Sequence, residues 1–200
     1  MTKIAVISSG KYTSFCNSIG LLQDLSHDLE ITIFAPVFNE LTDSLDCKSI
    51  SYYRIPQKPS LDTYSFISDT ICSDDCLVIV FSRYLIPDSI HSNFICVNFH
   101  PSVLPSFPGL TGYRDSLINR HLGFTAHKID SSVDQGDRLV SCEITPFPSM
   151  IPFDIDMISY RMCSLLSSKI IRLFHVGRLS STPYSHYSSS TIAGLEQRLK

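Results

Sequence analysis

Short apolar runs alternate along the first half of the chain with longer stretches in which apolar residues recur every three or four positions. This alternation is typical of βαβ units, in which helices cover a parallel sheet. After the first run, Phe15, Ile19 and Leu22 lie about one helical turn apart and predict an amphipathic helix over residues 12–25. We therefore expect an α/β fold with a Rossmann-like, mostly parallel sheet and helices on both faces. The strands predicted are residues 3–8, 30–35, 50–55, 77–81 and 95–99, and a second helix is predicted over 61–71.

The second half of the chain begins with a segment that cannot form a regular helix. Pro and Gly residues interrupt residues 101–112 repeatedly, so a shaped loop is expected after the fifth strand. Residues 180–200 are rich in Ser and Tyr and predict a loosely held tail rather than a second domain. The elements expected between loop and tail are a helix over 113–119, strands over 124–129 and 138–144 joined by a polar turn, and a long helix from near Asp154 to a stop near Gly177.

The composition limits the classes of protein to which the chain can belong. Of its 200 residues, 44% are hydrophobic and 18% are charged, which excludes a disordered chain. The formal net charge of −3 gives no broad basic field for a nucleic acid. No apolar run approaches the roughly 20 residues that span a bilayer, and the first residues lack the pattern of a secretion signal. We expect a cytoplasmic protein with no membrane or nucleic-acid partner.

The cysteines give no sign of a disulfide framework or a metal site. Seven are scattered along the chain, and Cys72 and Cys76 form the one close pair. An odd, scattered set indicates reduced thiols, and no second Cys or His pair follows at the spacing of a zinc site. We expect no bound metal.

The segment Asn98-Phe99-His100-Pro101-Ser102 is the first candidate site. Asn98 and His100 lie two residues apart at the end of the fifth strand, so both side chains leave the same face of the sheet. Open α/β sheets bind their ligands at this carboxyl edge. Taken alone, the pair is more often structural, with the His capping a strand and the Asn satisfying a turn.

A second group of polar residues lies in the following strand and turn. Strand alternation puts Thr125 and His127 on one face, and the turn after them returns Asp134 toward the edge of the sheet. A nearby carboxylate stabilises the protonated form of an imidazole, which can then donate hydrogen bonds near neutral pH. Asp130 and Asp137, in the same turn, have the character of solvated turn residues.

Together the two segments resemble the folate-dependent formyltransferases, a family that includes glycinamide ribonucleotide formyltransferase and the catalytic domain of methionyl-tRNA formyltransferase. The resemblance covers most of residues 77–179. It rests on Asn98-x-His100-Pro101-Ser102 with Leu104-Pro105, on Phe107-Pro108-Gly109, on Gly123-Phe124-Thr125-Ala126-His127 and on Val133-Asp134-Gln135-Gly136. It implies a formyltransferase-like fold, with residues 1–179 as the catalytic domain.

The resemblance also implies a reaction and roles for these residues. An amine would attack the formyl carbon of 10-formyltetrahydrofolate, the co-substrate, and Asn98 and His100 would donate hydrogen bonds to the oxygen that becomes negative. Asp134 would keep His100 protonated and help to move the amine proton, and His127 would hold Asp134. Ser102 and Thr125 would support these groups, and no metal is required.

Substrate-binding residues follow from the resemblance alone. The pterin would lie against Arg83, Tyr84, Leu85, Ile86 and Asp130, although core packing is an equal explanation for Leu85 and Ile86. The candidates for holding the acceptor are Gly10, Lys11, Thr13 and Ser14, in a loop and helix start that could bind an anion. That loop has a single glycine, and Tyr12 could crowd a phosphate there; a first-turn Thr or Ser is also a common helix cap.

The acceptor is therefore left open. Phosphoribosylglycinamide, which would place the chain in purine biosynthesis, suits the chain length and the Phe107-Pro108-Gly109-Leu110 match. An amino sugar on a nucleotide carrier is the second possible acceptor. Initiator tRNA is least favoured because no basic domain follows Gly177. A formyltetrahydrofolate hydrolase is disfavoured because such hydrolases carry an extra N-terminal regulatory domain, whereas here the first strand starts at Lys3. A non-catalytic folate-binding protein is disfavoured because it would not need Asn98, His100 and Asp134. The sequence also leaves a homodimer open.

Overall fold

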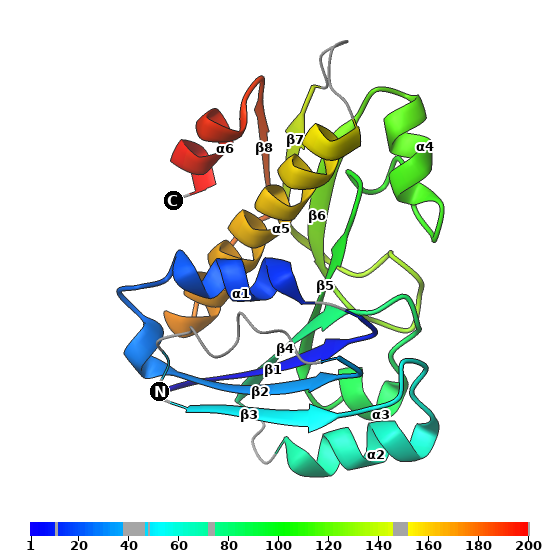
Figure 1. Ribbon diagram of the computed structural model, residues 1–200, viewed down its shortest axis with the longest axis vertical. Helices are drawn as coiled ribbons and strands as arrows, with labels where there is room; N and C mark the ends of the chain where they lie inside the picture. Colours follow the sequence, from blue (N-terminus) through cyan, green and yellow to red (C-terminus); the bar gives the residue numbers. More distant parts are fainter. Residues whose placement is uncertain (11, 38–46, 48, 72–74, 146–151, 200) are drawn as a thin grey trace.

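An eight-stranded sheet forms the centre of the computed structural model, which describes residues 1–10, 12–37, 47, 49–71, 75–145 and 152–199 (Figure 1). The strand order is β3-β2-β1-β4-β5-β6-β7-β8, and β6 runs antiparallel to both of its neighbours while the other pairs are parallel. The expected mostly parallel α/β fold is confirmed. The strands are β1 (Thr2–Ser8), β2 (Leu29–Ala35), β3 (Ser49–Arg54), β4 (Cys76–Phe81), β5 (Ile95–His100), β6 (Leu122–Lys128), β7 (Arg138–Ile144) and β8 (Ser185–Ser189).

Helices pack on both faces of the sheet, as expected (Figure 1). In β1, Ile4 and Val6 join the core that includes α1 and α5, whereas Ala5 and Ile7 join the core beneath α2 and α3. A strand buried on both faces reads as a continuous apolar run, which is why β1 is so clear in the sequence. The helices are α1 (Thr13–Gly20), α2 (Leu61–Thr70), α3 (Asp88–His91), α4 (Gly112–Ile118), α5 (Pro152–His175) and α6 (Ile192–Leu199), with a 3₁₀ turn at Ser26–Asp28.

The ends of two helices follow from local chemistry. Ser60 caps α2, since its hydroxyl accepts a hydrogen bond from the Thr63 amide at 3.2 Å. After α5, Gly177 takes a positive φ of 68°, and the Arg178 amide donates to the Leu173 carbonyl at 2.8 Å. The predicted stop at Gly177 is confirmed. The first helix ends earlier than expected, at Gly20 rather than residue 25, and the chain continues into the 3₁₀ turn.

The prediction of a loosely held tail after residue 179 is wrong. β8 pairs with β7 in parallel, and Leu195 and Leu199 of α6 are buried. Arg161 of α5 donates to Glu196 of α6 at 2.6 Å. The sequence hides this strand because β8 gains its place through backbone pairing at the sheet edge, and its Ser-rich side chains carry no apolar period.

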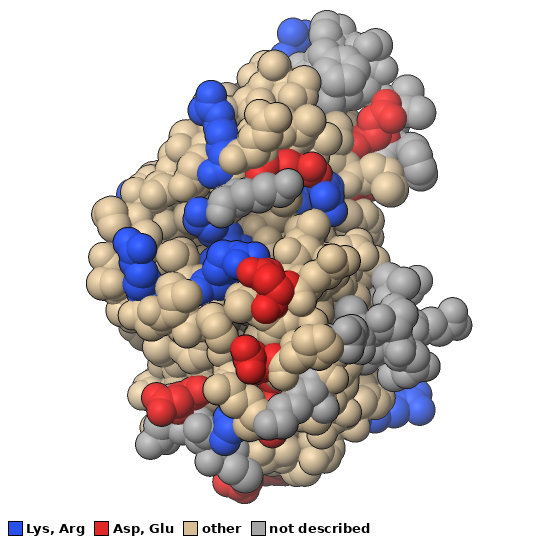
Figure 2. Space-filling view, turned by 90° about the vertical axis from the view of Figure 1, so that its left-hand side faces the viewer, with Lys and Arg blue, Asp and Glu red and all other residues tan. Residues whose placement is uncertain are grey.

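The described surface carries charges of both signs. Figure 2 shows Lys and Arg among Asp and Glu on the face that it presents, and ion pairs such as Arg172 with Asp24, at 2.7 Å, offset basic side chains. No helix in the described ranges is long and apolar enough to cross a membrane.

The six described cysteines are free thiols, and Cys72 lies outside the described residues. Burial raises the pKa of Cys76, Cys96 and Cys163 to about 12, so these thiols are protonated and inert at neutral pH. Among described residues, no group of three or more His, Cys, Asp and Glu side chains is arranged to hold a metal ion.

Candidate active site

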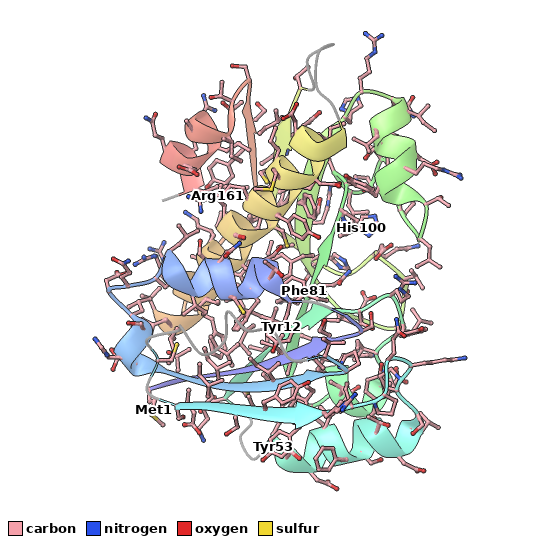
Figure 3. All side chains as sticks on the ribbon, in the orientation of Figure 1. Met1, Tyr12, Tyr53, Phe81, His100 and Arg161 are labelled. Carbon is pink, nitrogen blue, oxygen red and sulfur yellow. The ribbon has the colours of Figure 1, made fainter. Side chains whose placement is uncertain are left out.

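Antiparallel pairing of β5 with β6 brings the first two site residues together. Asn98 lies opposite His127 and His100 opposite Thr125 in this register. The side-chain nitrogen Nδ2 of Asn98 lies 3.2 Å from Nε2 of His127. His100 ends β5, on the side of the sheet toward α4 (Figure 3). The two polar segments singled out in the sequence therefore meet at one edge of the sheet.

His100 is held between two hydrogen-bond acceptors. Its Nε2 lies 2.8 Å from the Phe107 carbonyl oxygen, and its Nδ1 lies 3.3 Å from Oδ2 of Asp134. A neutral imidazole carries only one N–H, so it can donate to only one of these oxygens. A ring protonated at both nitrogens would satisfy both acceptors, and the His100 side chain is buried.

Asp134 lies in the turn between β6 and β7. Its φ of 54° is in the left-handed region, which Asp tolerates better than most residues. The Gly109 amide donates to Oδ2 of Asp134 at 2.8 Å, so the carboxylate also fixes the loop after β5. The site thus joins β5, β6, this turn and the loop into one hydrogen-bonded unit.

His127 lies opposite Asn98 in β6 and is buried. Burial is the main reason that the pKa of His127 lies below its ordinary value. The neutral ring donates from Nδ1 to the Lys128 carbonyl at 2.8 Å, which leaves Nε2 to accept from the Asn98 amide. The contact of Nε2 with Oδ1 of Asp134 is longer, at 3.6 Å. His127 therefore contacts the Asn98 amide closely and Asp134 at a longer distance.

Ser102 and Thr125 shape the loop after β5, and both are fully buried. Ser102 donates to the Phe107 carbonyl at 2.6 Å, the same oxygen that His100 contacts. Thr125 donates to the Ser102 carbonyl at 2.8 Å and accepts from the Leu104 amide at 2.9 Å. The Leu104–Pro105 peptide bond in this loop is cis. These bonds position the Phe107 carbonyl against His100.

Three features of the site were missed as functional elements in the sequence. The Phe107 carbonyl and the Gly109 amide are backbone groups, so the residue types do not predict their contacts. At Gly112, an added Cβ would collide with the Phe107 carbonyl oxygen and lie 2.7 Å from Nε2 of His100. The sequence signals that could have pointed to these features were the Phe107-Pro108-Gly109 match and the following Gly112.

Comparisons with known proteins agree with this geometry. A family model described as formyl transferase matches residues 70–150, which include Asn98, His100, His127 and Asp134. The phosphoribosylglycinamide formyltransferase of Haemophilus influenzae is 26% identical over 195 residues, covering 90% of each chain. The chain is thus similar to formyl transferases over the segment that carries the site.

Solved structures of formyl transferases share the fold. The phosphoribosylglycinamide formyltransferase of Coxiella burnetii has a TM-score of 0.75 at 20% identity, over 94% of this chain and 99% of that one. A sugar N-formyltransferase from a Shewanella species has a TM-score of 0.63 at 19% identity, over 93% of this chain and 77% of that one. The matches to methionyl-tRNA formyltransferases of Campylobacter curvus and Ehrlichia chaffeensis span only 25% and 34% of those longer proteins.

The residues that we expect to contact the pterin have different surroundings. Leu85 is 73% exposed and Arg83 is exposed, so both can meet a ligand, and Tyr84 is half-buried. Ile86 is buried in the core beneath α2 and α3, as the packing explanation expects. Asp130 is exposed, and its Oδ1 accepts from the Ser132 amide at 2.8 Å, which makes it a turn residue.

The residues assigned to the acceptor lie at the amino end of α1, apart from Lys11, which is outside the described residues. The Gly10 amide donates to the Ser8 hydroxyl at 3.1 Å. Thr13 opens the helix, and Ser14 is buried and hydrogen-bonded to Cys163 of α5. Tyr12 packs into the core with 1% exposure.

Proposed function

We propose that the chain transfers a formyl group from 10-formyltetrahydrofolate to a primary amine, and that this amine is phosphoribosylglycinamide. The observation that carries the proposal is the convergence of Asn98, His100 and Asp134, from a strand and a distant turn, in one hydrogen-bonded site. The match to the Haemophilus influenzae enzyme over 90% of both chains supports this acceptor. All three side chains lie within residues 1–179, the segment predicted as the catalytic domain.

Asn98 is the donor best prepared for the developing oxyanion. One N–H of its amide is used on the neutral His127, which fixes the plane of the amide. The second N–H can then donate to the formyl oxygen as the amine attacks the formyl carbon. Preorganised donors of this kind typically contribute about 10²- to 10³-fold to the rate.

His100 supplies the second donor, and its use requires an exchange of partners. In the substrate-free chain, Nε2 of His100 donates to the Phe107 carbonyl. We infer that the formyl oxygen replaces this carbonyl, so that the imidazolium donates to the oxyanion without losing its contact with Asp134.

Asp134 completes the proton balance of the reaction. The bond from the amine nitrogen to the formyl carbon forms, the bond from that carbon to the folate N10 breaks, and one proton must pass from the amine to N10. Asp134, with His100 or a water as intermediary, accepts the amine proton and returns it to N10. Arg83, Tyr84 and Leu85 are the residues that we propose contact the pterin.

A sugar nucleotide is the second candidate acceptor. At the amino end of α1, the Gly10 amide is bonded to Ser8 and the Ser14 side chain to Cys163. Groups that are already bonded are less available for a phosphate. The likeness in fold to a sugar N-formyltransferase is compatible with this alternative.

The test is to mix the protein with 10-formyltetrahydrofolate and each of several amines, and to measure release of tetrahydrofolate. We expect release only with phosphoribosylglycinamide; release only with an amino-sugar nucleotide would identify the second acceptor. Release without any amine would instead identify a hydrolase. Folate binding without turnover, or no folate binding, would overturn the proposed reaction.

A further inference from the structure

A cavity of about 370 Å³ lies beside the turn that carries Asp134. Its walls are the end of β6, the residues after Asp134, the start of β7 and the segment that follows α5. This volume falls within the range of about 300–1,000 Å³ that is usual for small-molecule sites. The lining residues that matter here are Lys128, Asp137, Arg138, Leu139, Leu179 and Tyr184. None of the proposed catalytic side chains lines it.

The charges around the cavity favour an anion. Lys128 and Arg138 are cationic, and Asp137 is the one carboxylate among the lining residues. Asp137 lies 3.6 Å from the Lys128 ammonium, but its side chain is 82% exposed, so the pair is well screened by water. The lining therefore has an excess of one positive charge at neutral pH.

Arg138 is oriented before any ligand binds. Its Nη1 donates to the Leu104 carbonyl at 3.1 Å, and its guanidinium carbon lies 4.8 Å from the centre of the Tyr184 ring. The Tyr184 hydroxyl is in turn 2.7 Å from Oγ of Ser141. A guanidinium fixed in this way has further N–H groups to offer, and its planar fork matches a carboxylate or a phosphate.

The lining also has an apolar part. Leu139 and Leu179 are buried beside the two cations. A site with a few charged groups and an apolar wall is typical of small organic ligands. We propose that this cavity binds a small organic anion through a carboxylate or phosphate group placed between Lys128 and Arg138.

The anion that binds here could be a free metabolite or a carboxylated part of the folate. The experiment titrates the full-length protein with citrate and with inorganic phosphate in a calorimeter, and repeats the citrate titration with tetrahydrofolate at saturation. Competition by tetrahydrofolate would identify the folate as the source of the anion. Independent binding would identify a free anion, and both results support the site.

The variant Lys128→Met tests the proposal, because it removes one cation and keeps a side chain of similar length. Citrate binding to one site per chain should weaken about tenfold or more in this variant. Arg114→Gln, which changes an exposed arginine outside the cavity, should bind citrate as the wild type does. The absence of citrate and phosphate binding to the wild type, or equal binding by wild type and Lys128→Met, would overturn the proposal. Circular dichroism of each variant checks that it is folded.

Discussion

The polar groups at the end of β5 and those at the amino end of α1 are organised in different ways. Asn98, His100 and Asp134 are bonded across two strands, a turn and a loop, so their positions depend on the whole fold. At α1, Gly10 bonds within its own loop and Ser14 to a buried thiol. The first region is arranged for one reaction, whereas the second is not arranged for one particular acceptor. We therefore expect substitutions in the first region to reduce kcat and those in the second to affect KM.

Replacing Asp134 should produce the largest loss. Asp134→Asn removes the proposed proton acceptor and the carboxylate that contacts Nδ1 of His100, so we expect kcat to fall about 10²- to 10⁴-fold. Release of tetrahydrofolate in steady state measures this. Asp137→Asn, at an exposed position of the same turn, is the matched control and should retain kcat within about twofold. Equal losses in the two variants would show that the turn, and not the carboxylate of Asp134, matters.

A methyl group at Gly112 should damage the same region without changing any polar side chain. Gly112→Ala forces the added Cβ against the Phe107 carbonyl and His100, so we expect kcat to fall about 10²-fold through misplacement of the imidazole. Gly20→Ala is the control, because no atom lies within 4 Å of its added Cβ. It should leave kcat unchanged and raise the free energy of unfolding by about 0.4–1 kcal/mol. Wild-type kcat in Gly112→Ala would mean that the contact with His100 is unimportant.

The protonation of His127 should appear in the pH dependence of stability. Its pKa is lowered by burial in the folded chain, so the unfolded chain binds a proton more readily. The folded state therefore loses stability as the pH falls below the ordinary value of about 6.5 and toward the lowered pKa. Urea denaturation at pH values between about 7.5 and 5 measures the free energy of unfolding. As the pH falls, this free energy should decline less steeply for His127→Gln than for wild type. Identical slopes would argue against a buried, neutral His127.

The smallest effect is expected at α1. Ser14→Ala removes a buried hydroxyl that is already bonded to Cys163, so KM for a phosphorylated acceptor should rise by no more than about threefold while kcat stays unchanged. Initial rates at varied acceptor concentration separate the two constants. A fall in kcat with unchanged KM would remove the distinction between the two regions.

Much of the fold could be predicted from the sequence because buried parallel strands carry a strong apolar signal. β7 was predicted at its observed limits, and β1, β2, β3 and β4 to within one residue at each end. β8 and α6 were missed for an opposite physical reason. β8 lies at the edge of the sheet, where Ser and His side chains are tolerated because backbone pairing supplies the contacts. The short helix α3 was also missed, since one turn carries too little periodicity.

The site was predictable where residue type carries the chemistry. Asn98 and His100 share a strand face, and Asp134 could be linked to them through the family resemblance. The contact of His127 with Asn98 could not be predicted, because it depends on the β5–β6 register and on which ring nitrogen faces the Lys128 carbonyl. The contact of Phe107 with His100 was equally hidden, since any residue type supplies a carbonyl oxygen.

The rate of formyl transfer by His100→Ala tests the central claim most directly. It should be measured in a single turnover, together with the affinity for folate. The account expects the rate to fall at least about a hundredfold while folate affinity stays nearly unchanged, because the imidazolium acts on the transition state. A rate equal to that of the wild type would contradict the proposed mechanism.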